Sequence, residues 1–293
     1  MLVNMKEMLK DAERHNYAIG SLNTPNFETL RAVIGAAEEL GCPIIINHAQ
    51  GHEPVVALET IAPLMKMYAE NAKVPVAMHI DHGLDINFCM RAVRAGFTSI
   101  MCDRSEYPLE KNIALTKQFV DLVKPLGITV EAELGAMPNN MPTEVPGQEA
   151  SDLSDLTKYF TRVDEAKKFA EETGVDVLAI SIGTVHGMYK EKSNLDIDRI
   201  KAIREAITDE NVHLGMHGCS GTEPDQVVSA INAGIKKINY FTAMDTGITP
   251  ALKQMIDDYE GRPLNYSVMV NVAMEELKKG AKKALELFMT SKK

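Results

Sequence analysis

The chain has 293 residues, 45% hydrophobic and 25% charged, a composition typical of a globular protein with a large core. The formal net charge of −10 at pH 7 argues against a broad basic surface for nucleic acid. The four cysteines are scattered and form no CxxC pair, so the sequence indicates neither a disulfide framework nor a cysteine zinc site. No apolar run approaches the ~20 residues of a membrane span, and the N-terminus lacks an apolar signal segment. We therefore expect a cytoplasmic protein with no membrane partner.

Short apolar runs alternate with helical patterns along the whole chain. The runs cover residues 17–23, 43–49, 74–81, 98–103, 128–135, 175–183, 212–218 and 236–242. They are apolar on both faces, which is typical of buried parallel strands. Segments such as 26–41 and 162–174 have i, i+3, i+4 apolar spacing and end in glycine. Eight such units predict a (β/α)8 barrel with an additional C-terminal helix at about 264–290, in one domain of residues 1–293.

A doubly wound open sheet is the alternative fold. Such a sheet usually has fewer strands and a Gly-rich phosphate turn after the first one, whereas "AIGSLN" (18–23) contains no GxGxxG. The segment 136–155 interrupts the alternation after the fifth run. Loops of this length are usually functional lids or disordered, and in a barrel this one would lie on the active face.

Polar side chains occupy the C-terminal ends of the expected strands. They are His79, Asp81, His82, Glu131, Glu133, His186, His217 and Asn239. In a barrel these ends meet at one mouth, and three neutral imidazoles with an open position form a catalytic zinc site. One such histidine alone is more often a hydrogen-bonded core residue, but three at strand ends favour a metal. Strand parity does not decide between His79 and His82, because the chain turns there.

A phosphate site is the second predicted feature. "GCSG" (218–221) lies just before the helical pattern 223–234, and "NYFT" (239–242) ends the eighth run. Backbone N–H groups at such turns and helix starts favour an anion. The loops after strands 7 and 8 form the recurrent phosphate site of barrels.

Together these motifs resemble the class II, zinc-dependent ketose-bisphosphate aldolases, the fructose- and tagatose-bisphosphate aldolases, along essentially the whole chain. The resemblance rests on "SLN" (21–23), "HIDHG" (79–83), "VEAELG" (130–135), "IGTVHGMYK" (182–190) and "MHGCSG" (216–221). It implies reversible retro-aldol cleavage of a phosphorylated ketose to dihydroxyacetone phosphate and an aldehyde. One Zn2+ per subunit would polarise the carbonyl, and a monovalent cation near the phosphate is also implied.

The resemblance further implies roles for individual residues. Asp81 would be the catalytic acid/base, and Glu144 in the loop after the fifth strand would handle the second proton transfer. The implied metal ligands are His82, His186 and His217, with Glu133 as an auxiliary or alternative carboxylate. The implied substrate contacts are Asn23, Gly187, Gly218, Cys219, Ser220, Asn239, Phe241, Thr242 and Arg262. A homodimer or homotetramer is implied, with Arg262 reaching the distal phosphate of a neighbouring subunit.

Three departures from the family pattern bear on the substrate. Cys219 and Phe241 replace a glycine and an aspartate or alanine, and Ala49 replaces a serine in "HAQGH". His48 and His52 could there bind an anion if protonated, or hydrogen-bond a neutral group. We therefore expect the phosphate beside the carbonyl to be required, whereas the group at the far end need not be a phosphate.

Two other functions stay open at the level of sequence. A zinc-dependent hydrolase of a sugar phosphate would use the same barrel and release inorganic phosphate. A catalytically idle sugar-phosphate-binding protein is the third hypothesis. The presence of Asp81 argues against it, because binding alone does not need that carboxylate.

Overall fold

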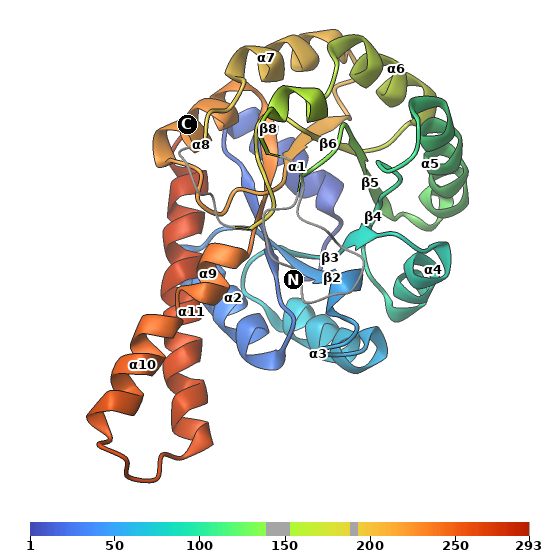
Figure 1. Cartoon of the computed structure of the whole chain (residues 1–293). Helices are drawn as coiled ribbons and strands as arrows, with labels where there is room; N and C mark the ends of the chain where they lie inside the picture. Colours follow the sequence, from blue (N-terminus) through green and yellow to red (C-terminus); the bar gives the residue numbers. More distant parts are fainter. Residues whose placement is uncertain (139–152, 188–192, 293) are drawn as a thin grey trace.

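The computed structural model describes residues 1–138, 153–187 and 193–292. Within this part of the chain, eight parallel strands form a closed barrel in chain order, with β8 pairing back to β1 (Figure 1). The strands are β1 (Ile19–Asn23), β2 (Ile44–Ala49), β3 (Val76–Gly83), β4 (Ser99–Cys102), β5 (Thr129–Leu134), β6 (Val177–Ile180), β7 (His213–Met216) and β8 (Ile235–Tyr240). The predicted (β/α)8 barrel is confirmed.

Helices cover the outside of the barrel, because each crossover between parallel strands returns along the outer face (Figure 1). They are α2 (Phe27–Leu40), α3 (Leu58–Asn71), α4 (Ile86–Ala95), α5 (Leu109–Val123), α6 (Val163–Thr173), α7 (Ile197–Ala206) and α8 (Pro224–Ala233). Short 3-10 turns are η1 (Gln50–His52), η2 (Lys124–Leu126) and η3 (Leu156–Tyr159). Gly41 and Gly174 end α2 and α6 in the left-handed conformation, as the sequence predicts.

The N-terminal helix α1 (Met5–His15) packs at the N-terminal ends of the strands. Its buried Met5 and Leu9 form a cluster with Ile45 and Val177 from the barrel interior. Asn4 caps this helix by accepting a hydrogen bond from the backbone N–H of Lys6 at 2.9 Å. This end of the barrel is therefore filled by apolar packing.

The barrel interior becomes polar above that cluster. His79, Glu131 and Lys237 are completely buried there, whereas branched apolar side chains dominate most barrel interiors. Charged groups survive burial only when they are paired and hydrogen-bonded. These three side chains therefore form a buried polar layer directly beneath the side chains at the C-terminal mouth of the barrel.

The C-terminal region leaves the barrel as an arm. After α9 (Thr242–Thr246), α10 (Thr249–Asp258) and the first half of α11 (Tyr266–Met289) extend beyond the barrel (Figure 1). The second half of α11 packs on α2 and β1 through buried residues including Leu285 and Phe288. The sequence predicted α11 but not α10. None of the described helices is long and apolar enough to cross a membrane.

Candidate active site

A bulge at the end of β3 brings two neighbouring side chains to the same mouth. The pairing of β3 with β4 shifts between Ile80 and Gly83, and His82 has a left-handed φ of 47°. In a regular strand His82 and Asp81 would face opposite sides. With the bulge, both lie near His217. Its Nδ1 atom is 3.1 Å from His82 Nε2 and 3.9 Å from Asp81 Oδ1. The strand thus includes His82, which the sequence placed beyond it.

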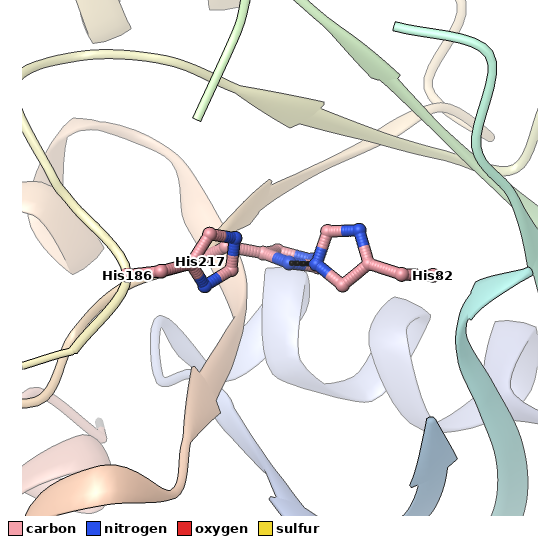
Figure 2. A group of neighbouring side chains, drawn as sticks. All are labelled: His82, His186 and His217. Carbon is pink, nitrogen blue, oxygen red and sulfur yellow. Dashed lines mark hydrogen bonds between the residues drawn. The ribbon is translucent and has the colours of Figure 1, made fainter. Parts of the chain in front are cut away.

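Three imidazoles converge at the mouth (Figure 2). His82 comes from β3, His186 follows β6 and His217 follows β7. Each offers one nitrogen, and the three nitrogens lie within 4.8 Å of one another. The ring centroids of His82 and His217 are 4.9 Å apart, and those of His82 and His186 are 5.1 Å apart. The structure therefore brings together the three histidines that the sequence predicted as metal ligands.

Carboxylates behind two of these rings determine which nitrogen faces the site. His82 Nδ1 is 2.7 Å from Asp103 Oδ2, and His217 Nε2 is 3.0 Å from Glu131 Oε1. Because a carboxylate accepts, those nitrogens carry hydrogen, which leaves His82 Nε2 and His217 Nδ1 as electron-pair donors. These two atoms face each other at 3.1 Å. Two lone pairs at this separation repel unless a proton or a metal cation lies between them, so the residues fit a cation.

The electrostatics agree with that fit. Burial opposes charge on His82, but the carboxylates of Asp81 and Asp103 raise its pKa to about 10, so positive charge is favoured at this point. Burial, aided by His82 and His217, lowers the pKa of His186 to about 3. His186 is therefore a neutral imidazole with an available lone pair.

Glu133 lies on the other side of His82. His82, Asp103 and Glu133 form a second group whose ligand atoms lie within 4.8 Å of one another. Burial, aided by the Asp103 carboxylate, raises the pKa of Glu133 to about 8. This position is compatible with an auxiliary carboxylate near a metal, but Glu133 is not in the three-histidine group.

Asp81 sits beside the three-histidine group without belonging to it. Its Oδ1 accepts a hydrogen bond from Asn239 Nδ2 at 2.8 Å and lies 3.9 Å from the nearest nitrogens of His82 and His217. Burial works against its charge, but His82, His217 and Lys237 hold the pKa of this carboxyl well below its usual range. Asp81 is therefore an ionised carboxylate that can accept a proton.

A chain of buried hydrogen bonds connects His217 to Asp81. Lys237 Nζ is 2.8 Å from Glu131 Oε2 and donates to Asn239 Oδ1 at 2.5 Å. Glu131 contacts His217, and Asn239 donates to Asp81. Asp103 and Lys237 contact this site although the sequence predicted no role for either. The available signals were an aspartate ending a strand and a lysine inside an apolar run, since buried lysine is rare unless paired.

A cavity of about 260 Å³ opens beside these residues. It is lined by Asn23, Asp81, His186, Gly187, Gly218, Cys219, Ser220, Asn239, Tyr240, Phe241 and Thr242. This lining contains every substrate contact implied by the resemblance except Arg262, and it adds Tyr240. One cavity therefore unites the proposed base, one of the three histidines and the phosphate motifs.

The turn after β7 and the helix after β8 are joined at one wall of the cavity. Gly218 has a φ of +66°, and a Cβ there would collide with the Val185 carbonyl oxygen, so only glycine fits. The backbone N–H of Ala243 donates to Ser220 Oγ at 3.2 Å. Cys219 is buried, which raises the pKa of its thiol to about 12. Cys219 is therefore a packed neutral side chain.

The remaining two predicted site residues are Arg262 and Glu144. Arg262 lies in the turn between α10 and α11, on the arm, where its Nε donates to the Tyr259 carbonyl at 3.0 Å (Figure 1). Arg262 does not line the cavity of its own chain. Glu144 lies outside the described residues.

The end of β2 corrects one expectation. Asn47 points into the barrel, where it bonds Ser21 and Asn23, so by parity the next side chain points outward. His48 is accordingly fully buried in the wall, with its ring centroid 6.3 Å from that of Phe88 on α4. The expectation that His48 meets the substrate is wrong. The ring centroid of His52 is 5.6 Å from that of Phe241, which lines the cavity.

The closed barrel and its mouth define a class of protein, a barrel enzyme. Three histidines, Asp81 and the turn of residues 218–221 meet at the C-terminal face, where barrel enzymes place their active sites. The family model described as fructose-bisphosphate aldolase class-II matches residues 3–293. The chain belongs to this family of lyases.

Individual relatives agree with this assignment. A fructose-bisphosphate aldolase from Geobacillus stearothermophilus is 36% identical over 258 residues, which cover 87% of this chain and 86% of that protein. The YdjI aldolase from Escherichia coli K12 is 33% identical with a TM-score of 0.84, covering 98% of this chain and 97% of that one. A fructose-bisphosphate aldolase from Campylobacter jejuni is 20% identical, with a TM-score of 0.82 over 100% of this chain and 97% of that one, and shows the shared fold.

Proposed function

We propose that this protein is a zinc-dependent aldolase that reversibly cleaves a phosphorylated ketose to dihydroxyacetone phosphate and an aldehyde. The observation that carries the proposal is the facing pair of imidazole nitrogens, His82 Nε2 and His217 Nδ1, 3.1 Å apart beside the ionised Asp81. Three imidazole ligands suit zinc among the common divalent ions. The names of the relatives from Geobacillus stearothermophilus and Escherichia coli K12, both aldolases, support the same chemistry.

Each residue then has a defined task. Held by His82, His186 and His217, zinc would supply Lewis-acid polarisation of the ketose carbonyl. Asp81 takes the proton of the C4 hydroxyl, so that the C3–C4 bond breaks and the C4 half leaves as an aldehyde. The electron pair of the broken bond stays on C3 of the dihydroxyacetone phosphate half, and C3 then takes a proton. Glu144 is the proposed donor of that proton, and Asn239 holds Asp81 in place.

The turn of residues 218–221 and Thr242 would hold the phosphate beside the carbonyl, with a monovalent cation as an additional proposed ligand. Asn23 and Gly187 line the same cavity and would contact the substrate. The opposite end lacks the usual anion-binding hydroxyl, because alanine stands at position 49. We therefore propose that the phosphate on the dihydroxyacetone half is required and a distal phosphate is not.

The test is a retro-aldol screen with added zinc. The substrates are the 1-phosphates and 1,6-bisphosphates of fructose and tagatose, which differ at C4, and a coupled assay detects dihydroxyacetone phosphate. Formation of that product from a 1-phosphate supports the proposal. Release of inorganic phosphate without it would favour the hydrolase hypothesis, and tight binding without any turnover would favour the idle binding protein.

The arm supports a proposal about assembly. Ile256 and Tyr266 expose 52% and 79% of their surface on α10 and α11, although both are large apolar side chains. Such exposed apolar groups mark interaction surfaces, and we propose that a second copy of the chain covers them in a homodimer or homotetramer. Arg262 on the same arm would then reach the neighbour's cavity. A cytoplasmic location is proposed on the four free cysteines.

A further inference from the structure

His52 lies directly behind a residue of the cavity lining, Phe241. It ends the turn η1, directly after β2. On one side, its ring centroid is 5.6 Å from that of Phe241, which lines the cavity together with Asp81. On the other side, the buried ring of His48 lies 5.8 Å away. The His52 ring is therefore held by aromatic neighbours next to the space where substrate would bind.

The backbone selects one tautomer of this ring. The N–H of Ala49 donates to His52 Nδ1 at 3.3 Å. A nitrogen that accepts a hydrogen bond carries no hydrogen, so the neutral ring carries its hydrogen on Nε2. Nε2 lies on the edge of the ring that points away from the Ala49 backbone. Within the parts of the chain that the structure describes, no residue accepts a hydrogen bond from it.

The surroundings also keep this ring uncharged. Burial, together with the nearby His48, lowers the pKa of His52 to about 4, which outweighs the opposite effect of Asp81. At neutral pH His52 is therefore a single N–H donor without charge.

The position of His52 relative to the phosphate turn, residues 218–221, indicates which half of the substrate would lie near its ring. The phosphate turn follows β7 and joins α9 after β8, whereas η1 follows β2. Asp81, from β3, would act at the C4 hydroxyl. With the phosphate end anchored at the turn of residues 218–221, the half beyond the broken bond would extend toward η1, where His52 lies.

We propose that His52 determines specificity by donating its Nε2–H to an uncharged hydroxyl of the aldehyde-derived half. Phe241 packs against the carbon chain beside it. The inference rests on the proposed aldolase function and narrows its substrate class to ketose 1-phosphates with a neutral, hydroxylated far end.

The test uses two substitutions that separate ring shape from hydrogen bonding. His52→Phe keeps a planar ring without a donor, and His52→Gln keeps an N–H near the position of Nε2. Each zinc-loaded variant is assayed on a cleaved ketose 1-phosphate and on its 5-deoxy and 6-deoxy analogues. Wild-type kcat/KM should favour the parent over one deoxy analogue by about tenfold, the value of one hydrogen bond with its desolvation cost. His52→Phe should abolish that preference, and His52→Gln should retain most of it.

Controls keep the outcomes distinct. His15→Phe, on the exposed end of α1, is the matched control and should behave like wild type. Zinc content and the circular dichroism spectrum establish that each variant is folded and loaded. Equal losses on parent and deoxy substrates in His52→Phe would overturn the proposal. So would a wild-type preference for the 1,6-bisphosphate above about a thousandfold, more than one or two hydrogen bonds supply.

Calorimetric Kd values for the same three compounds make the comparison without turnover. If no ketose phosphate is cleaved but His52→Phe still abolishes the binding preference for the parent, the proposed function fails and the role of His52 stands. If cleavage occurs and neither kcat/KM nor Kd discriminates the deoxy analogues, the role of His52 fails alone.

Discussion

At the scale of single residues, the site depends on carboxylates that orient imidazoles. Asp103 and Glu131 accept from the rear nitrogens of His82 and His217, which directs the opposite nitrogens toward each other. Lys237 balances the charge of Glu131 at 2.8 Å, deep in the barrel. Outer partners of this kind orient the ring and raise the basicity of a metal-binding imidazole.

His217→Ala should remove both bound zinc and aldolase activity. The substitution deletes one of the three proposed ligands and leaves the Glu131–Lys237 pair without its third partner. Zinc content by mass spectrometry and the coupled aldolase assay measure the two effects, and a chelator should inactivate the wild type. Full activity in a metal-free preparation would contradict the proposed metal dependence.

Asp81→Asn should retain zinc but lower kcat by about 10²–10⁴, the usual effect of losing a positioned acid/base. The side chain keeps its shape, whereas the amide no longer accepts a proton. Asp81 belongs to neither of the two groups of ligand atoms among the described residues, so metal content should not change. Near-normal turnover at full zinc occupancy would exclude Asp81 from the mechanism.

At the scale of elements, the bulge of β3 is held by its neighbours. Arg104 Nη1 donates to the carbonyls of Gly83, Leu84 and Asp103, at 3.2, 2.6 and 2.7 Å. Gln50 Oε1 accepts from the backbone of the same turn, including the N–H of Leu84 at 2.8 Å. A non-glycine residue with positive φ persists only when its surroundings over-determine it. These contacts therefore stabilise the conformation that directs His82 to the mouth.

Arg104→Met should weaken zinc binding about 10- to 100-fold, the range found for outer partners of metal ligands. It should also lower the denaturant midpoint of the metal-free protein, since buried carbonyls lose charged donors worth roughly 1.5–3 kcal/mol each. Competition with a chromophoric chelator measures the affinity. Arg162→Met, at an arginine 66% exposed, is the control, and equal effects in both variants would refute the positioning role.

At the scale of the whole molecule, the barrel and the arm have different surfaces. The second half of α11 is buried against the barrel through residues such as Leu277 and Leu285, whereas Ile256 and Tyr266 remain exposed on the arm. The same helix thus stabilises the barrel at one end and presents apolar side chains at the other.

Ile256→Glu combined with Tyr266→Glu should shift the protein from an oligomer to a monomer. Placing two carboxylates in an apolar interface imposes a desolvation cost without a partner. Light scattering after size-exclusion chromatography measures the mass. Leu126→Glu, at a 60% exposed residue of η2, is the control and should leave the mass unchanged. A monomeric wild type would refute the proposed assembly.

The sequence by itself determined the barrel, because each strand is an apolar run and the helices have their own periodicity, with glycine caps such as Gly41 and Gly174 ending several of them, all local signals. It also indicated which strand ends carry His82, His186 and His217, because a parallel barrel places those ends at one mouth. Only the tertiary structure decided the bulge at His82, because the bulge depends on pairing with β4. The partnerships of Glu131 with Lys237 and of Asp103 with His82 likewise join separate strands, and the packing of β2 against α4 buried His48 in the wall. Such contacts arise from closure of the barrel, which brings distant residues within hydrogen-bond distance and is not encoded in any single segment.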